Sequence, residues 1–497
     1  MAGIGFELQK LIRKGTLVST IQAFMFGSVL SAGPMILTVL CIGIIGWISY
    51  GLFHQGILQV FSVTIVYTFA FSLILTGPFQ LVFTRYVADK HFIKEFKDIY
   101  PGYFTSTVLV MVLALALAVP FYVLLEVWTP VGNILLYKIF GIAAFVFQCI
   151  IWQLMGFVGT TKEYQKVTWS YLFGTIVSIL VSFLLIPSIT VAGGMAGFCS
   201  GQLLIIVLLY RITTVELEKK QYWRKEYFVY LKKYYIIALI GLFFNIGIWI
   251  DKFLFWDHFE ESNGTSFFFT YNYYDVPYFL SFFSIIPAMA YFLILTETNF
   301  YKAYSSFMKD ILSQPLLIVK QRKNDMITTL KEGMRGMLKL QSITTLLLIV
   351  FAEQLLIFLG YRGVSIWLFR VLLLGAFFHV INMNINIIFL YYEMRKRALY
   401  LTILFAALNG IFTYISIQLG MQYFGYGFLL AGILTTAISW PLLVYSMKRI
   451  DFYIFANQPI ESVINTDDKW RFRSSKVLVD EDSQETKIKN KQPKINS

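Results

Sequence analysis

Charged residues are scarce in this chain of 497 residues: 14% are Asp, Glu, Lys or Arg, whereas 58% are hydrophobic and the mean hydropathy is +0.68. So little polar surface cannot cover a water-soluble globule of this size. The composition excludes a soluble protein and indicates an integral membrane protein. The net charge of +13 does not point to nucleic acid, because the cations separate hydrophobic runs instead of gathering on one soluble face.

Cysteines and catalytic motifs are also rare. The three cysteines, Cys41, Cys149 and Cys199, lie inside hydrophobic runs without paired spacing, so we expect free thiols, no disulfide and no metal site. The chain has no GxxxxGKS or GxxxxGKT loop for nucleotide phosphates, no HExxH, no CxxC and no GxSxG. A transporter with its own ATP site is therefore excluded, and we expect neither an enzyme nor a cofactor.

Long hydrophobic runs are abundant. Crossing a bilayer takes about 20 apolar residues. Twelve runs qualify: 17–50, 57–83, 103–125, 136–158, 168–186, 191–210, 235–256, 276–295, 340–359, 364–391, 400–419 and 426–445. We predict an all-α polytopic membrane protein with twelve transmembrane helices.

Basic residues segregate to one side of this arrangement. With both termini in the cytoplasm, all of the 41 Lys and Arg residues fall in cytoplasmic segments except Lys138, Lys252, Arg362 and Arg370. The positive-inside rule favours this orientation. The external loop after the seventh run is acidic instead, with Asp257, Glu260, Glu261 and Asp275.

The runs divide into two halves of six, residues 1–210 and 235–455, joined by a basic cytoplasmic linker at 211–234. Two such halves are typical of transporters built from internal repeats. Segment 298–339 mixes apolar and basic residues and suits amphipathic helices on an anionic inner leaflet. The start of the chain reads as an interfacial helix that leads into the first run. The polar tail 456–497 is expected to be disordered.

An internal repeat supports the two halves. The fourth run opens with Lys138 and continues through AAFVFQ, and the tenth opens with Arg370 and continues through GAFFH. Each half then ends with two runs separated by a glycine-containing turn. The offset is about 230 residues throughout. Both copies run in the same direction through the membrane, because each half holds an even number of runs.

Helix breaks occur within three runs. Gly33 and Pro34 lie in the first, Gly77 and Pro78 in the second, and Pro287 in the eighth. A proline frees backbone carbonyls, which a membrane helix tolerates where they line a cavity or are buried in protein. We favour a cavity-lining or hinge role for the first break. The second serves such a role or helix packing equally well.

Ionisable residues inside runs are rarer, since each costs about 2.5 to 3.5 kcal/mol at mid-bilayer on insertion scales. In the seventh run, Asn245, Trp249 and Lys252 share one helical face, and Asp251 adjoins them. Such a stripe suits a sugar chain, because rings stack on pyranoses while polar groups bind hydroxyls. Alternatively, Lys252 extends to the headgroups beside Trp256.

The tenth run carries His379, Asn382 and Asn386 on one face. They either line a substrate pathway or bond neighbouring helices, which is the commoner use. Arg370 points about 180° away from His379 and is a separate cation or an interfacial anchor.

Two further residues complete the candidate pathway set. In the first half, Lys138 poses the same question that Arg370 poses in the second: whether it is a separate cation or an interfacial anchor. Glu353, near the outer end of the ninth run, either titrates during transport or pairs with a cation.

The chain resembles the PelG family of bacterial exopolysaccharide exporters, within the multidrug/oligosaccharidyl-lipid/polysaccharide flippase superfamily. The resemblance rests on the opening MAGIGFEL, on SAGPMIL at 31–37, on GIWIDKFLFW at 247–256, and on twelve runs that end near Phe455. It implies export of Pel, an amino-sugar polymer of biofilm matrices, across the bacterial cytoplasmic membrane. It also implies a cytoplasmic glycosyltransferase, a membrane scaffold and a cyclic-di-GMP receptor as partners.

Two other functions stay open. A drug or small-solute antiporter coupled to H⁺ or Na⁺ would need a carboxylate deep inside a run, whereas Asp251 and Glu353 lie towards outer ends. A non-transporting membrane scaffold of a polysaccharide synthase would use the basic loops for docking. Polysaccharide transport through a central cavity between the halves is the reading we favour.

Overall fold

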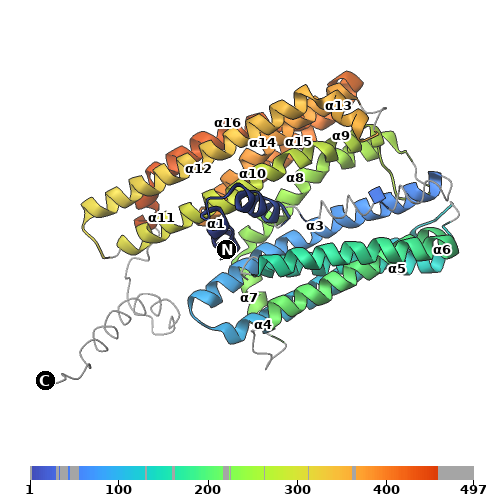
Figure 1. Cartoon of the computed structure of the whole chain (residues 1–497), viewed down its shortest axis with the longest axis horizontal. Coiled ribbons are helices and arrows are strands. Elements are labelled where there is room, and N and C mark those ends of the chain that lie inside the picture. Colours follow the sequence, from blue (N-terminus) through green and yellow to red (C-terminus); the bar gives the residue numbers. More distant parts are fainter. Residues whose placement is uncertain are drawn as a thin grey trace.

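Helices account for nearly all of the residues that the computed structural model describes (Figure 1). The structure describes residues 3–29, 33, 43–44, 55–128, 131–158, 163–215, 223, 225–261, 264–311, 313–360 and 365–456. Long runs of Leu, Ile, Val and Phe form helices because a helix satisfies its own backbone hydrogen bonds in lipid. In the described residues the β-structure is limited to one bridge between Val127 and Thr265.

In the N-terminal part, a helix covers Leu17–Val29. The other helices there are α1 (Gly3–Ile12), α3 (Gln55–Phe92), η1 (Phe96–Asp98), α4 (Ile99–Leu124), α5 (Ile134–Val158), α6 (Tyr164–Thr214) and α7 (Glu226–Lys233).

In the C-terminal part the helices are α8 (Tyr235–Phe259), α9 (Asn272–Phe282), η2 (Phe283–Ile285), α10 (Ile286–Tyr291), η3 (Phe292–Thr296), α11 (Glu297–Asp310), α12 (Leu316–Val350), α13 (Ala352–Phe358), α14 (Ile366–Tyr391), α15 (Arg395–Leu419), η4 (Met421–Tyr423), α16 (Tyr426–Lys448) and α17 (Ile450–Ala456).

Nine helices among the described residues are long and apolar enough to cross a membrane, or ten if α12 and α13, bent by 71°, form one span. One of the nine, α6, contains two predicted runs. Its backbone leaves the helical region at Ile189 and Thr190, and a Cβ on Gly193 would lie 2.5 Å from the carbonyl oxygen of Leu185. The chain therefore reverses there, and two antiparallel arms pack together. Most of the first predicted run, with Pro34 and Cys41, lies outside the described residues, so the count of twelve stays a prediction.

The helices form two bundles (Figure 1). The N-terminal bundle contains α3 to α7, whose apolar residues make two buried clusters. The C-terminal bundle contains α8 to α17 around one large cluster, which also takes in Ala70 of α3. Helices α3 and α8 pack against each other and join the bundles. We call the end that carries α7, α11 and α17 the basic end, and the end that carries α13 the opposite end.

The segment predicted to be amphipathic, 298–339, contains α11 and the first part of α12. Its apolar residues Phe300, Phe307, Met326 and Met334 are buried in the C-terminal bundle. The protein itself therefore covers this apolar face. Helices α11 and α12 extend as a hairpin at the basic end (Figure 1).

The helix from α9 to α11 changes type twice. A 3₁₀ turn at Phe283–Ile285 precedes Pro287 in the first turn of α10, and a π-helical segment follows at Phe292–Thr296. Such segments inside membrane helices often mark functional positions. By contrast, α3 stays helical through Pro78.

Candidate functional site at the contact between the bundles

Helix α3 crosses α8 at two glycines. A Cβ on Gly77 would lie 2.7 Å from the carbonyl oxygen of Gly241, and a Cβ on Gly241 would lie 2.3 Å from that of Gly77. Asn245 Nδ2 donates a hydrogen bond across the crossing to the carbonyl oxygen of Leu73, at 2.9 Å. Small residues let membrane helices approach this closely. Gly77 and Asn245 thus hold the bundles together at the middle of α3.

A charged network is buried on α8 towards the opposite end. Lys252 Nζ donates to Asp251 Oδ1 at 2.9 Å and to the carbonyl oxygen of Ile248 at 2.7 Å. The hydroxyl of Tyr274 donates to Asp251 Oδ2 at 2.8 Å, and Lys252 Nζ lies over the ring of Tyr278. Asp251 is 0% and Lys252 1% exposed. The lysine is therefore neutralised inside the protein and does not extend to the headgroups.

Asp275 of α9 belongs to the same region. Trp256 Nε1 donates to Asp275 Oδ2 at 2.8 Å, and the backbone N–H of Tyr271 donates to the same oxygen at 3.2 Å. Asp275 Oδ1 is buried without a hydrogen-bond partner in the described part of the chain. The region thus holds two carboxylates and one ammonium group. A buried carboxylate without a countercharge is costly, so this region favours an additional proton or cation.

Tyr67 of α3 connects this network to the N-terminal bundle. Its ring stacks on Trp256 with centres 4.8 Å apart. Its hydroxyl donates to the carbonyl oxygen of Phe269 at 2.9 Å and accepts from the Phe269 N–H at 3.0 Å. A shift of α3 relative to α8 and the segment that follows it would break all three contacts.

Two loops pair at the opposite end. The N–H of Trp128 donates to the carbonyl oxygen of Gly264 at 2.9 Å, and the N–H of Ser266 donates to that of Glu126 at 3.0 Å. One loop follows α4 and the other follows α8. They form a second connection between the bundles, made mainly of backbone hydrogen bonds.

At the basic end the bundles are joined by ionic contacts, which we call the clasp: Arg85, Asp89, Tyr234, Glu393 and Arg395. Arg85 of α3 pairs with Glu393 at 2.7 Å and with Asp89 at 2.9 Å. Tyr234 donates its hydroxyl to Asp89 at 3.0 Å, and Arg395 pairs with Glu393 at 3.0 Å and covers the Tyr234 ring. Glu393 has φ +54°, a strained value for a residue with a side chain.

The turn that carries Glu393 also reaches other helices. Tyr391 donates to the buried Glu297 of α11, and Arg397 donates to Ser446 of α16 and Tyr453 of α17. Movement of this turn would therefore disturb contacts with α11, α16 and α17 as well as with α3.

The predicted row on α14 is buried. Asn382 bonds α16, since its Nδ2 donates to the carbonyl oxygen of Gly432 at 3.1 Å and its Oδ1 accepts from Ser439 at 2.9 Å. Asn386 is 9% exposed, and its Oδ1 has no partner within the described ranges. Asn382 thus makes the kind of interhelical contact that membrane bundles commonly use.

His379 lies among aromatic rings. Its ring centre is 5.6 Å from that of Phe282 and 5.0 Å from that of Phe405, and neither of its nitrogens has a hydrogen-bond partner among the described residues. Phe282 stacks on Tyr278, at 4.8 Å, which in turn lies beside Lys252. An aromatic stack therefore links the two predicted stripes.

The other predicted pathway residues lie apart from this region. Lys138 donates to the carbonyl oxygen of Val123 at 3.3 Å, and Arg370 donates to that of Ile349 at 3.1 Å. Glu353 is exposed at the start of α13. Gly33, the described residue of the first break, is buried. The structure does not bring these residues into one surface with Lys252.

A cavity of about 490 Å³ lies beside the α3–α8 crossing. Helices α3 and α4 supply most of its walls, and Leu242 of α8 and Phe268 close it from the C-terminal bundle. Its polar lining is limited to Tyr67, Thr68 and Tyr122. Hydrocarbon surface of this kind accommodates an apolar chain better than a bare sugar.

Asp275, Tyr274 and Tyr278 were missed by the sequence reasoning, which placed Asp275 in an external acidic loop. The available signal was the spacing in NYYDVPY, which sets Tyr274 and Tyr278 one helical turn apart. Nothing in the sequence linked Arg85 to Glu393 as a pair, because the two residues come from opposite halves of the chain. Cys149 and Cys199 are free and buried, and the described residues contain no group of three potential metal ligands from His, Cys, Asp and Glu.

The arrangement is that of a known class. Solved structures with this fold include an outward-facing and an inward-facing multidrug resistance MATE family transporter of the MOP superfamily. Both are 13% identical, with TM-scores of 0.59 and 0.58, and the alignments cover 86% of this chain and 96% and 99% of those chains. A MOP superfamily transporter from Pyrococcus furiosus is 12% identical, with a TM-score of 0.60 over 86% of this chain and 96% of that one. The fold is that of MATE-like membrane transporters.

The family is more specific. The model described as "PelG: Putative exopolysaccharide Exporter (EPS-E)" matches residues 1–455, so the chain belongs to the PelG family. This confirms the resemblance drawn from its sequence motifs and the prediction of an all-α, multi-pass membrane protein, and it makes the protein a membrane transporter. No curated protein matches the chain.

Proposed function

We propose that this protein exports Pel polysaccharide, or its amino-sugar precursor, across the bacterial cytoplasmic membrane, with its basic end and both termini in the cytoplasm. The observation that carries the proposal is the match of the PelG family over residues 1–455. The basic end carries Arg85, Arg395 and Lys448, which suits the cytoplasmic side under the positive-inside rule.

Transport would require the bundles to move against each other. Three contacts join them in succession along α3: Tyr67 to the opposite-end network, Gly77 to Gly241, and Arg85 to Glu393. Opening at the basic end separates Arg85 from Glu393, and opening at the opposite end separates Tyr67 from Trp256. The tight glycine crossing between them is the natural pivot. In this mechanism Asn245, Trp249, Asp251 and Lys252 come to line the path when the opposite end opens.

The test is secretion of amino-sugar polymer by cells that carry variants in place of the native gene. Lys252→Leu and Asn382→Leu are each expected to lower secretion at equal protein level in the membrane. Lys225→Leu, at an exposed site, is the control and should secrete normally. Normal secretion by Lys252→Leu would contradict the assigned pathway, and normal secretion after gene deletion would overturn the function.

A second function, antiport of a small solute coupled to H⁺ or Na⁺, is favoured by one observation. The buried network holds Asp251 and Asp275 against the single cation Lys252, and Asp275 Oδ1 has no partner in the described residues. In a reconstituted assay, uptake of a cationic dye driven by a proton or sodium gradient, and lost in Asp275→Asn, would support antiport over polymer export.

The proposed partners would act at the basic end. A cytoplasmic glycosyltransferase and a membrane scaffold with a cyclic-di-GMP receptor would complete a Pel synthase complex there. If the protein were only a scaffold for the synthase, purified protein in vesicles would move no substrate while polymer synthesis would still require it.

A further inference from the structure

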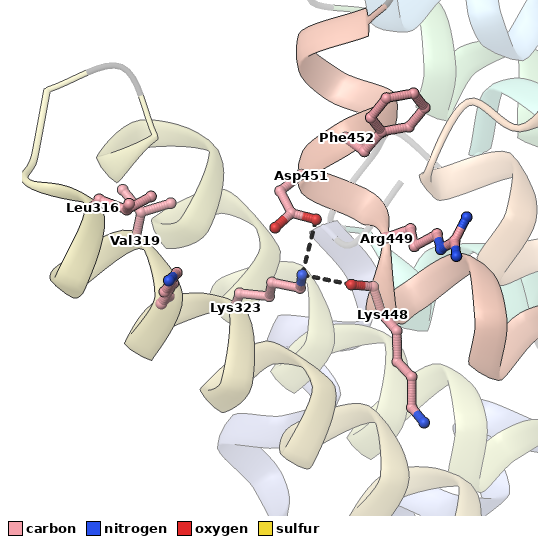
Figure 2. Close-up of a pocket in the computed structure, with 8 residues that line it drawn as sticks. Leu316, Val319, Lys323, Lys448, Arg449, Asp451 and Phe452 are labelled. Carbon is pink, nitrogen blue, oxygen red and sulfur yellow. Dashed lines mark hydrogen bonds and ion pairs between the residues drawn. The ribbon is translucent and has the colours of Figure 1, made fainter.

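A groove of about 510 Å³ lies at the basic end, between the start of α12 and the end of α16 with α17 (Figure 2). Four cations and one carboxylate line it, together with three apolar residues: Lys320, Lys323, Lys448, Arg449, Asp451, Leu316, Val319 and Phe452. None of these residues takes part in the contact between the bundles.

The single acid in the groove is already neutralised. Lys323 Nζ lies 2.9 Å from Asp451 Oδ1 and donates to the carbonyl oxygen of Lys448 at 2.6 Å. Figure 2 shows Lys323 and Asp451 pointing toward each other, while the side chains of Lys448 and Arg449 extend away from that pair. This internal pair fixes α17 against α12 and leaves the other cations available.

Those other cations have no carboxylate partner among the described residues. Lys320 and Lys448 are exposed and make no ion pair there. Arg449 donates to the neutral hydroxyl of Tyr445 at 2.6 Å and covers the Tyr445 ring. The groove therefore presents three uncompensated positive charges, and the complementary ligand is an anion.

The apolar part of the groove shows what kind of anion fits. Leu316 is 67% and Phe452 65% exposed, and Val319 is buried. Helix α16 has 23 residues, about 35 Å at 1.5 Å per residue, so its end at Lys448 lies at the boundary of a hydrocarbon core about 30 Å thick. Exposed apolar side chains beside cations at that depth match the glycerol and phosphate region of a lipid.

We propose that this groove binds the headgroup of an anionic phospholipid, with Lys320, Lys448 and Arg449 around the phosphate and Leu316 and Phe452 against the upper acyl chains. The bound lipid would anchor the α11–α12 hairpin and α17 to the membrane. This site is separate from the proposed path of the transported substrate. The lipid proposal can therefore be wrong while the export proposal holds.

The experiment is a calorimetric titration of the purified protein in neutral detergent. Short-chain phosphatidylglycerol, short-chain phosphatidylcholine and inorganic phosphate are titrated separately. The test variant is Lys320→Gln/Lys448→Gln. The control is Lys225→Gln/Lys396→Gln, which removes the same charge from exposed sites outside the groove. Unchanged thermal unfolding of both variants shows that they are folded.

We expect phosphatidylglycerol to bind more tightly than phosphatidylcholine. The test variant should lose roughly 25-fold in affinity, from about 1 kcal/mol for each cation near an anionic surface, and the control should lose nothing. Equal affinity for the two lipids, or an unaffected test variant, would overturn the proposal. Inorganic phosphate that displaces phosphatidylglycerol at similar concentration would show a site for free phosphate and overturn the lipid assignment.

Discussion

Gly77 of α3 and Gly241 of α8 lie back to back, and each occupies the space in which the other would need a side chain. The two helices can cross this closely only because neither residue has a Cβ atom. Since the two residues come from different bundles, their contact sets how far apart the bundles sit in the middle of the membrane.

Gly241→Ala should therefore push the bundles apart. The new Cβ would lie 2.3 Å from the carbonyl oxygen of Gly77, and overpacking of this kind costs about 1 to 3 kcal/mol. Thermal unfolding in detergent should show the loss. Gly410→Ala is the control, because its Cβ would meet only Ile250, at 3.4 Å. Equal melting temperatures for the two variants would contradict the pivot.

The buried ion pair on α8 predicts that a single variant loses more stability than the double variant that removes both charges. Asp251→Asn should destabilise the protein by about 3 to 5 kcal/mol, because it leaves the ammonium of Lys252 buried without its partner. Asp251→Asn/Lys252→Met should cost less than Asp251→Asn alone. Denaturant unfolding of the three proteins checks this. Glu353→Gln, at an exposed carboxylate, is the control and should stay within about 0.5 kcal/mol.

The clasp predicts a transport defect without a large stability defect. The side chains of Arg85 and Glu393 are 30% and 50% exposed, and pairs with such exposure contribute at most about 1 kcal/mol. Glu393→Gln should change the rate of polymer export because it weakens closure at the basic end. Glu393→Asp, which keeps the carboxylate that pairs with Arg85 and Arg395, should change that rate less.

The matched control for the clasp is Asp310→Asn. It breaks the ion pair between Arg322 and Asp310, which lies within one bundle and has a similar N–O distance of 2.9 Å. Export in this variant should equal that of the native protein. If Glu393→Gln and Asp310→Asn behave alike, the ion pair at the basic end does not act between the bundles.

Asp451 predicts a pH dependence for the docking of α17. Partial burial alone would raise the pKa of Asp451, but the hydrogen bonds from Lys323 and from the backbone N–H of Phe452 lower it by more. Its pKa therefore lies below the ordinary value of about 3.9. A carboxylate with a depressed pKa contributes stability above its unfolded-state pKa and loses it as the pH falls through its folded-state pKa.

The measurement compares melting temperatures of the native protein and Asp451→Asn between about pH 3 and 7. The native protein should be the more stable at pH 5 to 7, and the difference should shrink as the pH falls below about 4. A difference that stays constant down to pH 3 would show that the Lys323–Asp451 pair does not stabilise α17.

Composition and periodicity were enough for the class of fold. Runs of apolar residues predicted membrane helices at α4, α5, α8, α14 and α16 to within a few residues, since a helix in lipid depends on local hydrophobicity. The motifs around 31–37 and 247–256 pointed to the family that the comparison shows. Helix ends were less predictable, because α9 to α11 and α12 extend beyond the apolar runs and owe their length to packing against each other.

The candidate residues show the same limit: sequence spacing predicts neighbours within one helix, but it does not predict contacts between helices. Sequence spacing correctly placed Asn245, Trp249 and Lys252 on one helix beside Asp251, because their neighbourhood is local to α8. It did not reveal that Asn245 bonds α3, that Tyr274 bonds Asp251, or that Arg85 meets Glu393. Those partners lie 23 or more residues away along the chain, so no helical periodicity links them.

The sequence by itself determined that the protein is a helical membrane transporter and which family it belongs to, because hydrophobic length and short motifs are properties of neighbouring residues. Only the tertiary structure decided which polar groups are neutralised and where the bundles touch. Burial and pairing of charges depend on distances between helices, and those distances are set by side-chain packing that no single helix contains.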